Sequence, residues 1–401
     1  MPRVTLRTAA LALLLLAALA PVAAAAGRAA TARALGQQMR WAGPSSGAYV
    51  VDLNSGRTIY SLLAGTQRMP ASVQKLYTSV AALHRIGPAG RLATSVLAEE
   101  APDAAGVVAG DLYLRGSGDP TFDVVDSGRL AQQVADAGIV AVTGRVRGDE
   151  SAFDGQRGVP SSGFRLTSEV GPLSALTFNR GRSGRRSPFW QRRPARFAAA
   201  AFSKQLRALG VAVRRHAATG VTPRNAELVT EWRSPSVSDL VRLMNPPSDN
   251  FTAETLVKVL GAKFGGSGST AAGTTVVSDA LAEIEIAPQV VDGSGLSRSD
   301  RTSPREVVTM LRSMDGDASF TGSLAIAGRT GTLSDRMRGT RAQDRCRAKT
   351  GTLRDVSALA GYCTTRGGGN VAFAFLMNYV SPYGARILQD RMANALTRYR
   401  P

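Results

Sequence analysis

Three short segments contain the residue types of an enzyme that transfers acyl groups through a serine. They are Ser72-Val73-Gln74-Lys75, Ser248-Asp249-Asn250 and Lys349-Thr350-Gly351, in that order along the chain. Lysine occurs at only five positions, and two of these lysines complete the first and the third segment. The other basic residues are all arginine. Because arginine cannot lose its proton near neutral pH, the retained lysines are expected where an amine must become neutral.

Ser72 and Lys75 have the types and the spacing of a nucleophile and its base. A serine hydroxyl reacts slowly until a neighbouring group takes its proton, and a lysine amine with a lowered pKa can do so. Residues three positions apart on a helix share one face. The unpaired N–H groups of a helix start, that of Ser72 included, can donate to an oxyanion. Alone, however, this spacing is more often that of a solvated helix face.

The second segment has two interpretations. Ser248, Asp249 and Asn250 follow two prolines and precede an apolar run, and all three residue types commonly cap helix N-termini. In isolation the cap is the better interpretation. In a catalytic site, Ser248 would take part in proton transfer and Asn250 would hydrogen-bond to a substrate amide.

The third segment, with Thr352 added, is expected on a strand that pairs with the apolar run 358–363. Gly351 has no side chain, so a substrate backbone can lie against the strand edge. Lys349, Thr350 and Thr352 can bind a carboxylate, and the Thr352 N–H can supply a second oxyanion donor. The alternative is an ordinary hairpin edge.

Other features of the sequence limit the chemistry. His84 and His216 are the only histidines, and neither has a recognisable catalytic setting, so a Ser-His-Asp triad is not expected. The segment Arg329-Thr330-Gly331-Thr332 repeats the third motif, but with an arginine that cannot become neutral. The sequence contains no zinc-type ligand spacing and no phosphate-binding glycine motif, so neither a metal nor a cofactor is expected.

In combination, the three motifs resemble those of the penicillin-binding D-alanyl-D-alanine carboxypeptidase/endopeptidase family, the low-molecular-mass class C group. The resemblance runs through nearly the whole chain after its first residues. The further segments that carry it are Gly116-Ser117-Gly118-Asp119-Pro120-Thr121, Gly148-Asp149-Glu150-Ser151-Ala152-Phe153-Asp154-Gly155, Pro172-Leu173-Ser174-Ala175-Leu176 and Asp292-Gly293-Ser294-Gly295-Leu296-Ser297.

The resemblance implies an α/β (α+β) fold, with a transpeptidase/β-lactamase-like domain whose central antiparallel sheet is flanked by helices, plus a β-rich insertion domain. It implies hydrolysis of peptidoglycan stem peptides at terminal D-alanine or at cross-links, with β-lactams as inhibitors. In the implied mechanism Ser72 attacks the carbonyl, Lys75 accepts the proton, and Ser248 relays a proton to the leaving amine. Asn250 and the strand of Lys349 hold the substrate, and water then resolves the acyl-enzyme.

A length of 401 residues and a hydrophobic content of 44% indicate two domains with ample cores. A charged start, a short apolar run and an alanine stretch predict a signal peptide over 1–26, because the apolar part is short for a membrane-spanning helix. The transpeptidase-like domain is expected over 27–90 and 234–401, with the insertion domain at 91–233. The mature protein is expected to be exported and soluble, in the periplasm or the cell wall.

Local patterns predict several elements. Apolar strands flank the turn Asn54-Ser55-Gly56-Arg57, and a helix that contains Ser72 in its first turn stops before Gly87-Pro88. Residues 91–233 consist of short β-like runs separated by Gly, Asp and Pro. Further helices are expected at 237–244, 305–314 and near 387–399, and strands at 358–363 and 371–377.

The formal net charge of +19 raises the question of a polyanionic partner. The densest basic stretch, residues 180–196, has the Gly, Ser and Pro content of an exposed loop. For an exported protein, anionic wall polymers or a membrane surface are the expected partners, and no nucleic acid is expected. A solvated loop in an arginine-rich sequence is an equally good interpretation.

Cys346 and Cys363 are the only cysteines, and an exported protein can oxidise such a pair. If the strands around Lys349 and Leu359 form a hairpin that turns at Arg354-Asp355, the two cysteines lie opposite each other. The register therefore favours a disulfide, and two small buried thiols are the alternative.

Two other functions are open on the sequence alone. A β-lactamase would need a dedicated base for rapid deacylation, and none is identifiable. A non-catalytic cell-wall-binding protein would use the basic residues as its functional surface, but intact Ser72, Lys75 and Lys349 argue against it.

Overall fold

The computed structural model describes residues 27–184 and 189–400. The predicted signal peptide, residues 1–26, and part of the arginine-rich stretch, residues 185–188, lie outside the described residues. The chain divides into two compact units: unit 1 contains Met1–Val73, Arg301–Gly316 and Leu324–Pro401, and unit 2 contains Gln74–Asp300 and Asp317–Ser323. The limits of an insertion domain at 91 and 233 stay a prediction.

Unit 1 is built on a six-stranded sheet with the order β11-β12-β13-β14-β1-β2, in which every neighbouring pair is antiparallel. The strands are β1 (Ser46–Asp52), β2 (Thr58–Leu62), β11 (Ala325–Ile326), β12 (Cys346–Leu353), β13 (Val356–Thr364) and β14 (Asn370–Asn378).

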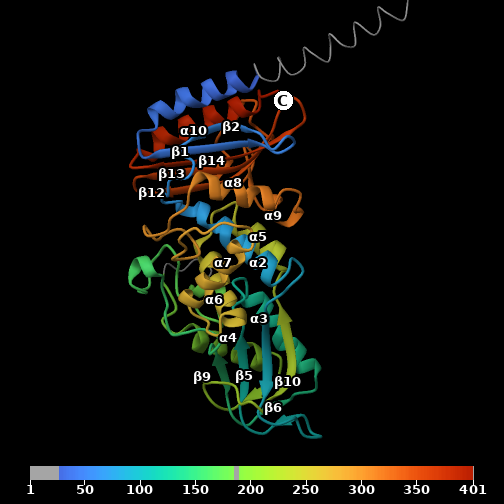
Figure 1. The fold of residues 1–401 in the computed structure, drawn as a ribbon. Helices are drawn as coiled ribbons and strands as arrows, with labels where there is room; N and C mark the ends of the chain where they lie inside the picture. Colours follow the sequence, from blue (N-terminus) through green and yellow to red (C-terminus); the bar gives the residue numbers. More distant parts are fainter. Residues whose placement is uncertain (1–26, 185–188, 401) are drawn as a thin grey trace, which may run out of the picture. The chain divides into compact units, whose positions relative to one another are not determined.

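Helices cover both faces of this sheet. Helix α8 (Pro304–Ser313) packs against β14, β1 and β13, and α10 (Pro382–Leu396) packs against β13, β12 and β14. Figure 1 shows the two helices on opposite sides of the sheet. Strand β13 is consequently buried from Val356 to Cys363, which explains why its sequence lacks the apolar–polar alternation of a half-exposed strand. The predicted central antiparallel sheet flanked by helices is confirmed.

The hairpin of β12 and β13 has the register expected from the sequence. Leu353 pairs with Val356 across the turn, and Cys346 pairs with Cys363 at the other end. The two cysteines form a disulfide. The bridge therefore ties together the strand that contains Lys349 and its neighbour.

Unit 2 contains two smaller sheets, and all of their strands lie between Ala93 and Arg233. The five-stranded sheet has the order β10-β3-β5-β7-β9, and the three-stranded sheet has the order β4-β6-β8. Helices α3 (Val124–Asp136) and α4 (Pro194–Ala208) pack against each other and contribute to the same core. The strands are β3 (Ala93–Ala98), β4 (Val107–Val108), β5 (Leu112–Gly116), β6 (Ala141–Val142), β7 (Val146–Asp149), β8 (Ala212–Val213), β9 (Ala218–Thr219) and β10 (Glu227–Arg233).

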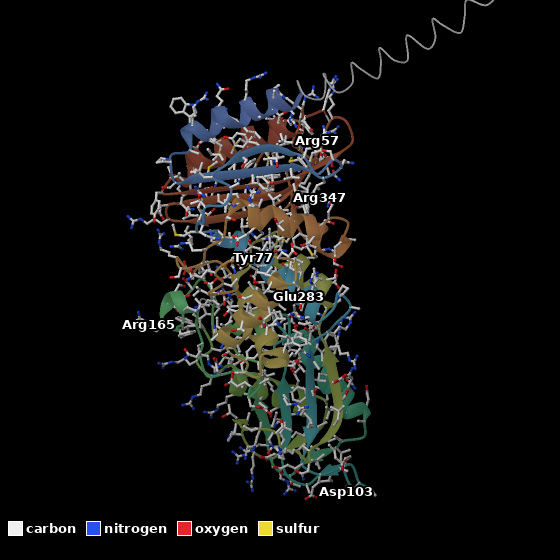
Figure 2. All side chains as sticks on the ribbon, viewed as in Figure 1. Arg57, Tyr77, Asp103, Arg165, Glu283 and Arg347 are labelled. Carbon is white, nitrogen blue, oxygen red and sulfur yellow. A yellow bond between two sulfur atoms is a disulfide. The ribbon has the colours of Figure 1, made fainter. Side chains whose placement is uncertain are left out.

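The rest of unit 2 is a group of helices around α2 (Lys75–Arg85), which is buried from Lys75 to Leu83. Tyr77 of this helix is fully buried (Figure 2). The helices in contact with α2 are α5 (Val237–Met244), α6 (Asn250–Phe264), α7 (Thr270–Ala282) and α9 (Ala318–Thr321). Among the described residues, no helix is both long and apolar enough to cross a membrane.

Most local predictions are confirmed, and the differences have physical causes. The α-helix after Pro70 begins at Lys75, because residues Ala71–Gln74 form a 3-10 turn. Helix α10 begins at Pro382, five residues before the predicted start, because proline is favoured at the first helical position. Helices α3, α4 and α7 were not predicted. The sequences of α3 and α7 contain Gly and Val, which lower helix propensity, and α4 follows directly on the arginine-rich stretch that was expected to be a loop.

We expect the disulfide to stabilise the protein, because it closes a loop between residues 17 positions apart. On the loop-entropy model the double variant Cys346→Ala/Cys363→Ala should lose about 3 kcal/mol of unfolding free energy. Urea denaturation with and without reductant measures the loss, and the double variant, which has no bridge to reduce, is the control. Two free thiols in exported protein, counted under denaturing, non-reducing conditions, would contradict the bridge.

Candidate active site

Ser72 lies in a 3-10 turn that leads directly into α2. The segment follows Pro70, and Ala71 has a positive φ of 48°, so the chain bends sharply just before Ser72. Lys75 is the first residue of α2, directly after this turn.

Strand β12 approaches the backbone of this turn at Gly351. A Cβ atom at Gly351 would lie 2.5 Å from the Pro70 carbonyl oxygen and 3.1 Å from the Ser72 nitrogen. From the sequence, the missing side chain of Gly351 was expected to make room for the backbone of a substrate. The structure shows that the protein's own chain, at Pro70 and Ser72, already requires glycine here, and a substrate contact of Gly351 stays a prediction.

The other residues of the third motif have different environments. Lys349 is fully buried, and its Nζ donates to the carbonyl oxygen of Thr350 at 3.0 Å. The hydroxyl of Thr350 lies 2.7 Å from that of Thr332, in hydrogen-bond contact. The exposed Thr352 accepts a hydrogen bond from the Arg386 guanidinium at 3.2 Å.

The second Thr-Gly-Thr segment supports the first. Its residues Gly331–Leu333 form a 3-10 turn that packs against β12, and Thr332 reaches Thr350. Arg329 instead forms a two-bonded ion pair with Asp344, with nitrogen–oxygen distances of 2.6 and 2.9 Å. No sequence pattern indicated that this copy contacts the third motif.

Lys75 of unit 2 has no exposed surface, and two neutral oxygens accept hydrogen bonds from its amine. They are Asn250 Oδ1 and the carbonyl oxygen of Ser294, each 2.7 Å from Nζ. Burial lowers the pKa of Lys75 to about 8, although nearby carboxylates, first Asp292 and then Glu254, oppose the shift. A substantial fraction of this amine is therefore neutral in mildly alkaline solution.

The Ser248-Asp249-Asn250 segment forms the helix cap that its sequence suggested, and its catalytic role stays a prediction. Asp249 is the N-cap of α6, and its side chain accepts from the Thr252 N–H at 2.7 Å. Asn250, the first residue of the helix, contacts Lys75 as described and donates to the Glu169 carbonyl oxygen at 3.2 Å. Ser248 has a positive φ of 63°, and its backbone N–H donates to the Asn245 carbonyl oxygen at 3.2 Å.

A loop at residues 292–297 completes the surroundings of Lys75, and it was not among the predicted site residues. Asp292 is buried, and its carboxylate accepts from the N–H groups of Ser294, Gly295 and Ser297 at 2.6 to 3.1 Å. These bonds fold the loop so that the Ser294 carbonyl oxygen points to the Lys75 amine. The repeated Gly and Ser in the sequence were a signal for such a tight loop.

Two further carboxyl groups are buried near this loop. Glu254 of α6 accepts from the N–H groups of Gly293 and Ser294, and Asp300 accepts from those of Val291 and Asp292. Burial, followed by the repulsion of Asp292, raises the pKa of both Glu254 and Asp300 well above the ordinary range.

A fold with a helix-flanked antiparallel sheet, a serine in a turn and a buried lysine three residues later defines a serine acyl-transfer class of protein. The chain belongs to the D-Ala-D-Ala carboxypeptidase 3 (S13) family, whose model matches residues 29–182 and 181–399. It is 30% identical to a D-alanyl-D-alanine carboxypeptidase of Actinomadura sp. (strain R39), in an alignment that covers 89% of this chain and 82% of that protein.

Solved structures show the same fold. Penicillin binding protein 4 (dacB) from Haemophilus influenzae matches with a TM-score of 0.79 and 21% identity, over 91% of this chain and 99% of that one. The same protein in complex with a β-lactam matches with a TM-score of 0.77, over the same shares of the two chains. Bd3459, a peptidoglycan endopeptidase from Bdellovibrio bacteriovorus, matches with a TM-score of 0.58 and 17% identity, over 87% of this chain and 90% of that one.

Proposed function

We propose that this chain is a serine-type D-Ala-D-Ala carboxypeptidase that acts on peptidoglycan stem peptides through an acyl-enzyme. The observation that carries the proposal is the buried amine of Lys75, whose pKa is lowered to about 8, three residues after a serine in a sharp turn. The membership of the S13 family supports the choice of substrate.

In the proposed mechanism Ser72 attacks the carbonyl of the penultimate D-alanine, and the neutral Lys75 amine accepts the hydroxyl proton. Ser248 relays a proton to the leaving amine, and Asn250 holds the substrate. Lys349, Thr350 and Thr352 bind the terminal carboxylate, while backbone N–H groups of Ser72 and Thr352 stabilise the oxyanion. Water then hydrolyses the acyl-enzyme.

The same acyl transfer would open a peptide cross-link, since that bond also joins the carbonyl of D-alanine to an amine. We therefore include DD-endopeptidase activity in the proposal. We also propose that the protein is exported, because its proposed substrate lies outside the cytoplasm.

Benzylpenicillin should form a long-lived covalent adduct on Ser72, because a β-lactam presents a reactive amide carbonyl to the activated hydroxyl and no dedicated deacylating base is evident. Intact-mass measurement detects the adduct and peptide mapping locates it. The variant Ser72→Ala is the control and should remain unmodified. An adduct on another residue, or none on the wild-type protein, would contradict the proposed nucleophile, and rapid turnover would indicate a β-lactamase.

The acylation rate should rise with pH through about 8, because the base form of Lys75 is its neutral form and the pKa of this amine is lowered to about 8. Lys75→Arg keeps the charge but cannot become neutral, so it should abolish acylation. Lys349→Arg should keep part of the activity, because carboxylate binding tolerates a fixed charge. Acylation rates measured from pH 6 to 10 test all three statements. If the Lys75→Arg variant retains most of the acylation rate, Lys75 acts only through its charge and is not the base.

We further propose that a basic cavity of unit 2 binds anionic polymers of the cell wall. Arg192, Arg193 and Arg196 line a cavity of about 830 Å³ at the N-terminus of α4. None of the three is in an ion pair with any residue of 27–184 or 189–400. The helix dipole adds positive potential at this end, so the cavity favours a polyanion.

Replacement of these three arginines by glutamine should weaken binding of a short poly(glycerol phosphate) by about tenfold or more at low salt. The matched control replaces three other exposed arginines of unit 2, Arg214, Arg215 and Arg224, and removes the same charge. Equal losses in the two triple variants would show that net charge alone attracts the polymer. Stronger binding to anionic phospholipid vesicles than to the polymer would assign the cavity to a membrane surface instead.

A further inference from the structure

We propose that Glu254 is a positioning residue for Lys75: it fixes the loop carbonyl that accepts from the Lys75 amine, and its own proton controls how readily that amine becomes neutral. This inference rests on the proposed function, in which Lys75 is the base.

Helix α6 reaches Lys75 along two routes. Asn250 and Glu254 are four positions apart, so they share one face of the helix. Asn250 Oδ1 accepts from the Lys75 amine directly at 2.7 Å. Glu254 Oε1 accepts from the N–H groups of Gly293 at 3.1 Å and Ser294 at 2.8 Å, and the carbonyl oxygen of Ser294 accepts from Lys75 at 2.7 Å. One face of α6 therefore positions both oxygens, Asn250 Oδ1 and the Ser294 carbonyl oxygen, that accept hydrogen bonds from the Lys75 amine.

The loop has little freedom to move away from this face. A Cβ at Gly293 would lie 2.5 Å from a methyl group of Val257 and 2.9 Å from the Ala253 carbonyl oxygen, both on α6. Glycine therefore allows the loop backbone to lie directly on the helix. Without the acceptor oxygen of Glu254, the buried N–H of Gly293 would lose its acceptor and that of Ser294 would keep only Asp292, so the loop would shift.

The environment of Glu254 favours its neutral form. The side chain is fully buried, and its Oε2 has no hydrogen-bond partner within residues 27–184 and 189–400. An ionised oxygen without a partner is costly in the interior, and burial together with Asp292 raises the pKa of Glu254. The charged or titratable groups that act on this part of the protein are Lys75 on α2, Asp292 and Asp300 in and after the loop, and Asp249 and Lys258 on α6.

The protonation of Glu254 matters because the Glu254 carboxylate raises the pKa of Lys75. When Glu254 loses its proton, its negative charge stabilises the ammonium form of Lys75 and raises the pKa of that amine. When Glu254 is neutral, this effect is absent, and burial keeps the pKa of Lys75 low. The two groups therefore titrate as a pair rather than independently.

Two substitutions separate the positioning effect from the charge effect. Glu254→Gln keeps an acceptor oxygen but cannot ionise, so the rising limb of the rate of acylation by benzylpenicillin should move to lower pH by about one unit. Glu254→Ala removes the acceptor, so the rate should fall by about 10- to 100-fold at every pH, because a small displacement of a catalytic group has that effect.

Thr255→Val is the matched control, because Thr255 is the next residue of α6, is fully buried, and its hydroxyl has no partner among the described residues. It should keep the wild-type pH profile. Thermal melting shows which variants fold, and if Glu254→Ala does not fold, the pH profile of Glu254→Gln decides. An unchanged profile in Glu254→Gln would overturn the inference. A wild-type protein that penicillin does not acylate would instead overturn the proposed function.

Discussion

The burial of a single amine is the constraint on which the arrangement of α2, α6 and the 292–297 loop depends. Lys75 has no exposed surface, and removal from water disfavours its ammonium form. Two neutral oxygens, from Asn250 and Ser294, compensate part of this cost through hydrogen bonds and leave the amine able to lose its proton. Burial therefore destabilises the ammonium form of Lys75 and favours the neutral amine that can act as a base.

The nearby acids limit how far this shift can go. Asp292, Glu254, Asp249 and Asp300 all raise the pKa of Lys75, yet Asp292 and Glu254 accept hydrogen bonds from backbone N–H groups of the loop. These carboxyl groups fold the loop first and influence the amine through space. The same side chains thus determine both the shape and the electrostatic potential around Lys75, which is why geometry and charge must be tested with separate substitutions.

Local patterns predicted the elements whose geometry is set by neighbouring residues. The β12–β13 hairpin was predicted in register because the position of a tight turn fixes every pair in the two strands, down to Cys346 and Cys363. The contact of Asn250 with Lys75 was not predicted, because no local pattern relates two residues that are 175 positions apart. The loop at 292–297 was noted only for its resemblance, because no local rule relates a Gly/Ser loop to a distant helix.

Gly351 shows how a glycine that the sequence assigns to a substrate can be required by the protein's own backbone. The sequence suggested that glycine at this position makes space for a ligand, because an edge strand without a side chain admits a second backbone. In the structure that second backbone is the turn at Pro70 and Ser72, whose carbonyl and N–H groups lie where a Cβ would be. The glycine is thus required before any substrate binds. The backbone nitrogen of Ser72, the proposed nucleophile, is one of the atoms that leave no room for a side chain at Gly351. Strand β12 and the turn of Ser72 therefore pack closely within unit 1.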